Sequence, residues 1–227
     1  MARVWSDDAR FTDRCEAGRA LARRLTAYAS RRDVVVLALP RGGVPVAFEI
    51  ASALHAPLDV LVVRKLGFPG HEEFAMGAIA SGGVRVMNDD IPPEYLPPPE
   101  AIAAVTQVEQ AELERRERAY RGDRVLTPVR GQTVLLVDDG LATGTTMQAA
   151  VKAVRLMAPA RIVVAVPVGS VQACAALEPA VDEFVCLSTP EPFTAVALWY
   201  RDFPQTTDEE VAELLATATG FEKLRSD

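Results

Sequence analysis

An acidic pair followed by a cluster of threonines is the part of this sequence best suited to chemistry. Asp138 and Asp139 end an apolar run, and Thr-Gly-Thr-Thr at positions 143–146 opens a helical pattern. Backbone N–H groups at a helix N-terminus are unpaired and partly positive, so they attract phosphate. Gly144 allows close approach to the backbone, and the threonine hydroxyls can donate hydrogen bonds to phosphate oxygens.

The two carboxylates suit a different part of the same ligand. When ionised, Asp138 and Asp139 only accept hydrogen bonds, which fits sugar hydroxyls or the water molecules of a hydrated Mg²⁺ ion. A strand followed by an ordinary Asp/Thr helix cap is the alternative interpretation of this segment. The full order of strand, acidic pair, phosphate-sized turn and helix favours a site for a ribose phosphate.

Two basic segments could bind further phosphate groups. Arg41, Gly42 and Gly43 follow an apolar run, and two glycines allow the backbone to lie close to a ligand. Arg64 and Lys65 end a second apolar run and could neutralise pyrophosphate, Arg64 as a planar fork and Lys65 as a point charge. The alternatives are an ordinary strand-to-helix turn and a solvated strand end.

Alternating strands and helices must position these residues. Continuous apolar runs predict buried strands, and helical patterns lie between them. This alternation predicts an α/β fold, a parallel twisted sheet flanked by helices with right-handed crossovers. Ligands bind beyond the carboxyl ends of such strands, where all three clusters are expected. The predicted strands are 34–39, 59–63, 134–137, 162–166 and 183–187.

Length and pattern predict a single domain over 1–227 with an insertion and a tail. The insertion at 66–130 is expected to contain a mobile loop at 66–73, a hairpin over 74–87 and a long helix over 100–121. Residues 188–227 form the C-terminal hood and tail. A further helix is predicted over 11–29, with Leu21 and Leu25 on its apolar face.

Composition excludes several classes of protein. The net charge of −7 disfavours nucleic-acid binding, and no apolar run is long enough to span a membrane. The first eight residues are polar and lack a signal-peptide pattern. The three cysteines are widely spaced, which predicts free thiols rather than disulfides or a zinc site, and hence a cytoplasmic protein.

The acidic segment resembles a known motif. Residues 137–146, Val-Asp-Asp-Gly-Leu-Ala-Thr-Gly-Thr-Thr, are similar to the motif of type I phosphoribosyltransferases that binds 5-phosphoribosyl 1-pyrophosphate (PRPP). The Asp-Asp-x-x-Ala-Thr-Gly form is the one seen in adenine phosphoribosyltransferases. The chain also resembles a bacterial branch of predicted phosphoribosyltransferases at 38–45, 63–67 and 198–203.

The resemblance implies that an acceptor, a nitrogenous base, displaces pyrophosphate from PRPP with the help of Mg²⁺, in a homodimer. Two other functions on the same fold stay open: a non-catalytic sensor of PRPP or nucleotides, and a ribose-phosphate phosphorolysis enzyme. By this resemblance, the catalytic residues are Asp138, Asp139, Arg64 and Lys65, and the metal is held by Asp138 and Asp139 directly or through water. The 5′-phosphate is bound by Ala142, Thr143, Gly144, Thr145 and Thr146, and pyrophosphate by Arg41, Gly42, Gly43 and Lys65. The acceptor is stacked on by Trp199, Tyr200 and Phe203.

Two details of the resemblance concern single positions. Family members often have a non-proline cis peptide bond in the pyrophosphate loop, and we expect it between Arg41 and Gly42. Ala142 stands where enzymes that use hypoxanthine or guanine usually have an aspartate. Because alanine cannot hold a purine ring nitrogen by a charged hydrogen bond, little turnover of these two bases is expected.

Overall fold

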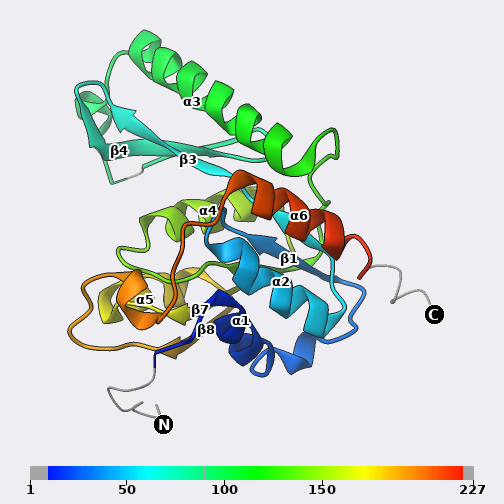
Figure 1. Ribbon diagram of the computed structural model, residues 1–227. Coiled ribbons are helices and arrows are strands. Elements are labelled where there is room, and N and C mark those ends of the chain that lie inside the picture. The colour runs from blue at the N-terminus through cyan, green and yellow to red at the C-terminus, as the bar shows by residue number, and fades with distance from the viewer. Residues whose placement is uncertain (1–9, 89, 222–227) are drawn as a thin grey trace.

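The chain forms two sheets of different kinds (Figure 1). The computed structural model describes residues 10–88 and 90–221. Five parallel strands form the larger sheet in the order β2-β1-β6-β7-β8, and three antiparallel strands form the smaller sheet in the order β3-β4-β5. The predicted α/β class is therefore confirmed. The strands are β1 (Val34–Ala38), β2 (Leu58–Val60), β3 (Val63–Phe68), β4 (His71–Ala80), β5 (Val84–Met87), β6 (Thr133–Val137), β7 (Arg161–Val168) and β8 (Glu183–Ser188).

Helices cover both faces of the parallel sheet, which explains why its strands are apolar throughout. Val34 and Val36 of β1 pack in the cluster that contains α1, α2 and α6, whereas Val35 and Leu37 pack in the cluster that contains α4 and α5. Successive strand residues point to opposite faces, so both sets must be apolar. The helices are α1 (Arg14–Ala22), α2 (Gly43–Leu54), α3 (Pro99–Arg121), α4 (Thr145–Leu156), α5 (Val171–Leu177) and α6 (Asp208–Ala218), with 3₁₀ turns at Thr26–Tyr28, Pro93–Tyr95, Glu178–Ala180 and Val196–Trp199.

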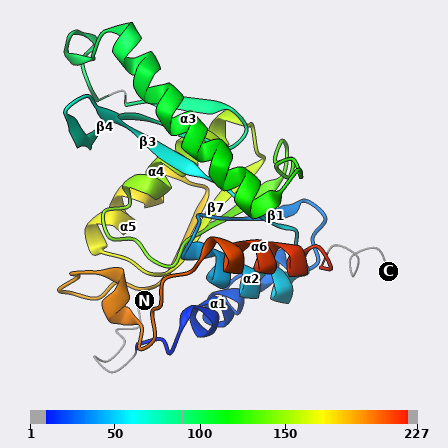
Figure 2. The ribbon, with the colours of Figure 1, turned by 45° about the horizontal axis from the view of Figure 1, so that its top comes forward.

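The smaller sheet and α3 cover most of the segment predicted as an insertion, 66–130, although β3 begins earlier, at Val63. Figures 1 and 2 show α3 lying along β3 and β4, with its C-terminal end near α6. A buried ion pair fastens that end to the parallel sheet, because Arg121 Nε lies 2.8 Å from Asp59 Oδ1 of β2. Arg121 also donates to the carbonyl of Val60 and to Ser81 Oγ. The insertion is thus anchored at its far end by a buried, hydrogen-bonded charge.

The second predicted strand was wrong at its C-terminal end. The parallel strand stops at Val60, and the chain starts β3 of the other sheet at Val63. Between them, the backbone N–H of Val62 donates to Ser81 Oγ, and the N–H of Ser81 donates to the Val62 carbonyl. These bonds pull the chain away from the parallel sheet, so Arg64 and Lys65 lie in the antiparallel sheet rather than at a parallel strand end.

The segment expected as an irregular loop at 66–73 is mostly a hairpin. β3 and β4 pair with a bulge at Gly67, and only Pro69 and Gly70 lie between the strands. A Cβ atom at Gly67 would lie 2.7 Å from the carbonyl oxygen of Glu72, so glycine is what allows the strands to approach here. Gly67, expected from the sequence in an irregular loop, therefore allows β3 and β4 to pair. The predicted mobility of this segment stays a prediction.

Other expectations differ in extent. The N-terminal helix covers 14–22 rather than 11–29, with Leu21 and Leu25 fully buried as predicted. The three cysteines are free thiols. Across the described ranges, no helix has both the length and the apolar character needed to cross a membrane. The eight N-terminal residues and the last six residues of the predicted tail lie outside the described part of the chain.

Candidate functional site

The acidic pair and the Arg-Gly-Gly loop lie against each other at the carboxyl ends of β6 and β1. A Cβ atom at Gly42 would lie 2.0 Å from Asp139 Oδ2, and one at Gly43 would lie 2.9 Å from the Cα atom of Asp138. Real Cβ atoms do not approach other atoms that closely, so a side chain at Gly42 would displace the Asp139 carboxylate and one at Gly43 would displace the backbone of the acidic loop. The two loops therefore lie side by side, as their strand-end positions predicted; that they bind a ligand stays a prediction.

Burial disfavours the charged forms of both aspartates, and the charge of Asp139 adds to this at Asp138. Burial, with the charge of Asp139, raises the pKa of Asp138 well above its ordinary value. Burial also raises the pKa of Asp139, although the hydrogen bond from Arg14 opposes the shift. The backbone N–H of Asp139 donates to Asp138 Oδ1 at 2.9 Å. A bound cation or a set of hydroxyl donors would stabilise the ionised pair.

Arg14 is a site residue that sequence reasoning missed. Its Nε lies 2.8 Å from Asp139 Oδ2, and its Nη1 donates to the carbonyl of Pro204 at 2.7 Å. A signal was present in the sequence, because Arg14 lies seven residues before Leu21 and thus on the apolar face of α1. An arginine on a buried helix face requires a polar partner.

The aromatic residues predicted to stack on the acceptor surround this contact. Tyr200 is 3% exposed, its hydroxyl donates to the Asp139 carbonyl at 2.6 Å, and its ring packs against Phe11 and Phe203. Phe203 lies under the Arg14 guanidinium, and Trp199 stacks on Phe193. In this arrangement the Tyr200 ring is enclosed by protein, so it supports the acidic loop. Stacking on an acceptor by Trp199 or Phe203 stays a prediction.

The threonine loop leads into a helix whose N-cap residue is a glycine. Gly144, with φ at 74°, makes no side-chain capping hydrogen bond to α4, and the N–H of Thr145 donates a long bond of 3.5 Å to Thr143 Oγ1. Thr143 and Thr146 are exposed, and the hydroxyls of Thr143 and Thr145 lie 3.1 Å apart. Ser170 Oγ donates to the Ala142 carbonyl at 2.7 Å and fixes the loop on the end of β7. The N-cap position itself holds a glycine, so it lacks the Asp or Thr side chain of an ordinary helix cap.

The predicted pyrophosphate-binding arginines are engaged in ion pairs. Arg41 Nη1 lies 3.4 Å from Asp208 Oδ1 of α6, and Arg64 Nε lies 2.6 Å from Glu109 Oε2 of α3. The expected position of the cis peptide bond was wrong by one residue, because the bond joins Pro40 and Arg41. Gly42 instead has right-handed helical dihedrals as the N-cap residue of α2.

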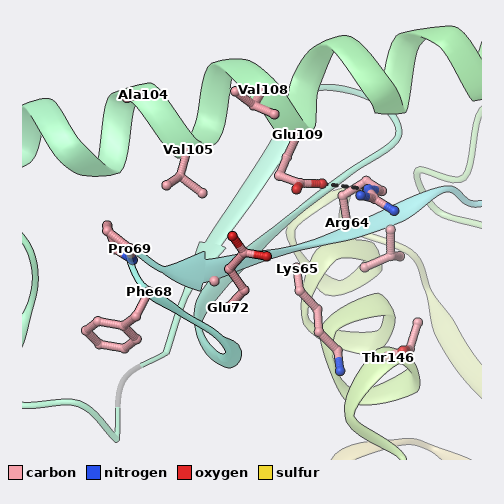
Figure 3. A pocket seen from close by; sticks show the side chains of 12 residues that line it. Arg64, Lys65, Phe68, Pro69, Glu72, Ala104, Val105, Val108, Glu109 and Thr146 are labelled. Carbon is pink, nitrogen blue, oxygen red and sulfur yellow. Dashed lines mark hydrogen bonds and ion pairs between the residues drawn. The ribbon is translucent and has the colours of Figure 1, made fainter.

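A cavity of about 720 Å³ lies between α3 and the β3–β4 hairpin (Figure 3). In Figure 3, Arg64 points to Glu109, whereas Lys65 points away from α3 toward the first turn of α4, where Thr146 lies. Consecutive strand residues face opposite sides, so Arg64 and Lys65 leave β3 in different directions, although both line this cavity. In this structure Lys65 is the one of the two that points toward the threonine loop. The cavity is lined by Val63, Arg64, Lys65, Gly67, Phe68, Pro69, Glu72, Ala104, Val105, Val108, Glu109 and Thr146.

The donor set suits Mg²⁺ bound together with a ligand. Within the described ranges, no cluster of three or more His, Cys, Asp or Glu residues could hold a metal ion alone. Mg²⁺ typically takes one or two protein carboxylates and fills its other positions with water and ligand phosphates. Asp138 and Asp139 supply the two carboxylates, so the residues present fit a metal that arrives with a phosphate ligand.

Comparisons with known proteins agree with this geometry. A family model described as "Phosphoribosyl transferase domain" matches residues 12–194. A Mycobacterium tuberculosis protein (strain ATCC 25618 / H37Rv) named "Putative phosphoribosyl transferase" is 49% identical over 208 residues, which make up 92% of this chain. The chain spans only about half, 47%, of that relative. The crystal structure of the protein TT1426 from Thermus thermophilus is 41% identical, with a TM-score of 0.81, over 92% of this chain and 98% of that one.

Proposed function

Because the chain belongs to the phosphoribosyl transferase family, we propose that it transfers ribose 5-phosphate from PRPP to a small-molecule acceptor and releases pyrophosphate. The observation that carries this proposal is the contact between the Gly42–Gly43 loop and the acidic pair. It brings carboxylates suited to a sugar directly beside a loop suited to pyrophosphate. A short loop joins this acidic pair to the N-terminus of α4, where glycine occupies the N-cap position.

Each part of PRPP has a proposed partner. The carboxylates of Asp138 and Asp139 accept hydrogen bonds from the ribose hydroxyls. The backbone N–H groups and hydroxyls of residues 142–146 hold the 5′-phosphate at the positive end of α4. The loop at 41–43 and Lys65 hold the pyrophosphate, with Arg64 joining if it leaves Glu109.

The chemistry required of the protein is orientation and charge stabilisation. The C–O bond between the anomeric carbon and pyrophosphate breaks, and a bond from that carbon to the acceptor nitrogen forms. Positive charge develops on the ribose in a transition state resembling an oxocarbenium ion, and the acidic pair lies on the sugar side where it can stabilise this charge. Mg²⁺, when bound with PRPP, neutralises charge on the leaving pyrophosphate.

The proposed acceptor is a nitrogenous base other than hypoxanthine or guanine. Ala142 is exposed, and its backbone carbonyl already accepts a hydrogen bond from Ser170. Its methyl group offers a base neither a charge nor a hydrogen bond. Trp199 remains the proposed stacking residue, because the Phe203 ring already lies against the Arg14 guanidinium and Tyr200. The proposed assembly is a homodimer in the cytoplasm.

The test is binding of Mg·PRPP to the double variant Asp138→Asn, Asp139→Asn. Wild-type protein should give a calorimetric signal that the double variant loses, while its circular dichroism stays that of the folded protein. Asp123→Asn, Asp182→Asn is the matched control, since both aspartates lie away from the acidic pair. Equal PRPP affinity in the double variant and the wild type would disprove the assignment of the acidic pair.

A non-catalytic PRPP sensor is the second candidate, favoured by one observation. Both arginines proposed for pyrophosphate are paired with carboxylates of α3 and α6. Ligand binding would exchange these pairs for phosphate contacts and so move the helices. Release of pyrophosphate from PRPP with a panel of bases separates the two functions, since a sensor binds PRPP without releasing pyrophosphate.

A further inference from the structure

Arg14 is the one cation that contacts the acidic pair among the ion pairs formed by described residues. Its side chain is 10% exposed and comes from α1, far along the chain from the acidic loop. The contact is made to Asp139 Oδ2 alone. Among the hydrogen bonds between described residues, Oδ2 accepts the one from Arg14 and Oδ1 accepts none.

The guanidinium is held on three sides. Besides the bond to Asp139, it donates to the Pro204 carbonyl, and its central carbon lies 3.7 Å from the centre of the Phe203 ring. A planar fork can make these three contacts together, whereas the round ammonium of lysine cannot. The position of Arg14 is thus set by the C-terminal segment and is independent of any ligand.

Asp139 is held from its other sides as well. The Tyr200 hydroxyl donates to its backbone carbonyl, and the Gly42 backbone lies against its carboxylate. Three distant segments therefore meet on one residue: α1, the loop before α2 and the segment after the 3₁₀ turn at Val196–Trp199. Such convergence limits the rotamers open to Asp139.

We infer that Arg14 is a positioning residue that holds Asp139 with its Oδ1 directed to the ribose hydroxyls of the ligand. The inference rests on the proposed function, since it presumes that the acidic pair binds ribose. It also gives Tyr200 and Phe203 a role: they hold Asp139 and Arg14 in place. Arg14 acts through Asp139 and does not itself touch the ligand.

A purely structural role for Arg14 predicts something different. If Arg14 only joined α1 to the C-terminal segment, its loss would loosen the fold and so lower the affinity for every ligand by the same factor. A positioning role instead weakens ligands that contain ribose and spares those that do not. The comparison of ligand classes therefore separates the two roles.

The experiment measures dissociation constants of Mg·PRPP, ribose 5-phosphate and metal-free pyrophosphate by calorimetry for wild type, Arg14→Gln and Arg14→Lys. We expect both variants to bind the two ribose ligands about 10- to 100-fold more weakly, the range found when a supporting partner of a ligand-binding side chain is removed. Pyrophosphate affinity should stay within about twofold of wild type. Arg19→Gln is the control, since it removes an exposed ion pair with Glu49 on the same helix.

Two further variants keep the test sharp. Phe203→Leu removes the ring against which the Arg14 guanidinium packs but leaves the ion pair. It should weaken binding of the two ribose ligands by a smaller factor and spare pyrophosphate. This variant replaces Arg14→Gln in the test if Arg14→Gln does not fold. In protein that already carries Asp139→Asn, adding Arg14→Gln should lower the affinity for the ribose ligands little further, because the partner of Arg14 is already changed. Equal losses for all three ligands, additive effects in this cycle, or full affinity in Arg14→Gln would each overturn the inference. Wild-type protein that binds no ribose ligand would instead refute the proposed function itself.

Discussion

The two sides of the proposed PRPP site are built differently. On the sugar side, Asp139 is paired with Arg14 in a contact whose side chains are 15% and 10% exposed. On the pyrophosphate side, Arg64 is paired with Glu109 in a contact whose side chains are 28% and 21% exposed. The sugar side draws its contacts from the core, whereas the pyrophosphate side draws them from the helices α3 and α6.

This difference indicates that the sugar side is preorganised, whereas the arginines of the pyrophosphate side must exchange their ion-pair partners for the ligand. Breaking a buried pair by removing one member costs about 3–5 kcal/mol, so the Arg14–Asp139 contact persists when ligand binds. Exposed ion pairs contribute only about 0.2–1 kcal/mol, so the partly exposed pairs with Glu109 and Asp208 should yield to a polyanion at smaller cost than the buried pair. We therefore expect ligand-dependent change to be concentrated on the α3 side.

The largest expected effect comes from Gly42→Ala, which tests the rigidity of the sugar side. The new methyl would collide with the Asp139 carboxylate, since even the ideal Cβ position lies 2.0 Å from Oδ2. We expect Mg·PRPP binding to fall below calorimetric detection and the free energy of unfolding to fall by about 1–3 kcal/mol. Gly220→Ala is the control, because its Cβ would meet only the Thr217 carbonyl at 3.4 Å. Normal PRPP affinity in Gly42→Ala would mean that the two loops need not touch.

The next effect is a gain in stability with a loss of function. The pKa of Asp138 is raised in the folded state, so the folded protein is penalised as pH rises above the ordinary value of 3.8 and through the raised one. Asp138→Asn removes this penalty and should stabilise the protein at neutral pH by on the order of 1 kcal/mol, with no gain below pH 3.8, where both states are protonated.

Thermal unfolding across pH measures this difference, and Asp182→Asn serves as the opposite case. The backbone N–H of Ile162 and the Arg155 guanidinium lower the pKa of Asp182, so its charge stabilises the fold above its ordinary pKa. Asp182→Asn should therefore lose a little stability at neutral pH. A loss of stability in Asp138→Asn at neutral pH would contradict the assigned cost of burying the pair.

A smaller effect is expected on the pyrophosphate side. Glu109→Gln weakens the ion pair and frees Arg64, so Mg·pyrophosphate should bind more tightly, by up to about fivefold for a contact worth up to about 1 kcal/mol. Glu114→Gln on the same helix is the matched control, since Glu114 accepts a hydrogen bond from Gln110 rather than from a cation of the site. Weaker pyrophosphate binding in Glu109→Gln would show that Glu109 supports the ligand instead of competing with it.

The smallest expected effect concerns the hairpin at 66–73. Its strands are paired, so only the turn at Pro69 and Gly70 is free to change, and Lys65 lies at its base. Mg·PRPP should slow amide hydrogen exchange of these residues modestly and leave β1 and β6 unchanged. Equal exchange with and without ligand would show that the hairpin does not respond to the site.

Local sequence patterns determined much of the fold and half of the site. Continuous apolar runs are typical of strands buried on both faces, which is why the five predicted strands have their counterparts in β1, β2, β6, β7 and β8, although β2 ends at Val60. The acidic pair and threonine loop were found because their residues are consecutive. Their chemistry depends on the strand–turn–helix order, which is a local property.

Only the tertiary structure decided which distant groups meet. Arg14 and Asp139 are separated by 125 positions, and their contact depends on how α1 and the C-terminal segment pack on the end of β6. Tyr200 is buried and supports the acidic loop. The sequence could not predict this, because an aromatic residue suits a core and a stacking surface equally well. The chain left the parallel sheet after Val60 because Ser81, in another segment, supplied the hydrogen bonds. Periodicity records which face of an element is buried, but the partner on that face is set by packing in three dimensions.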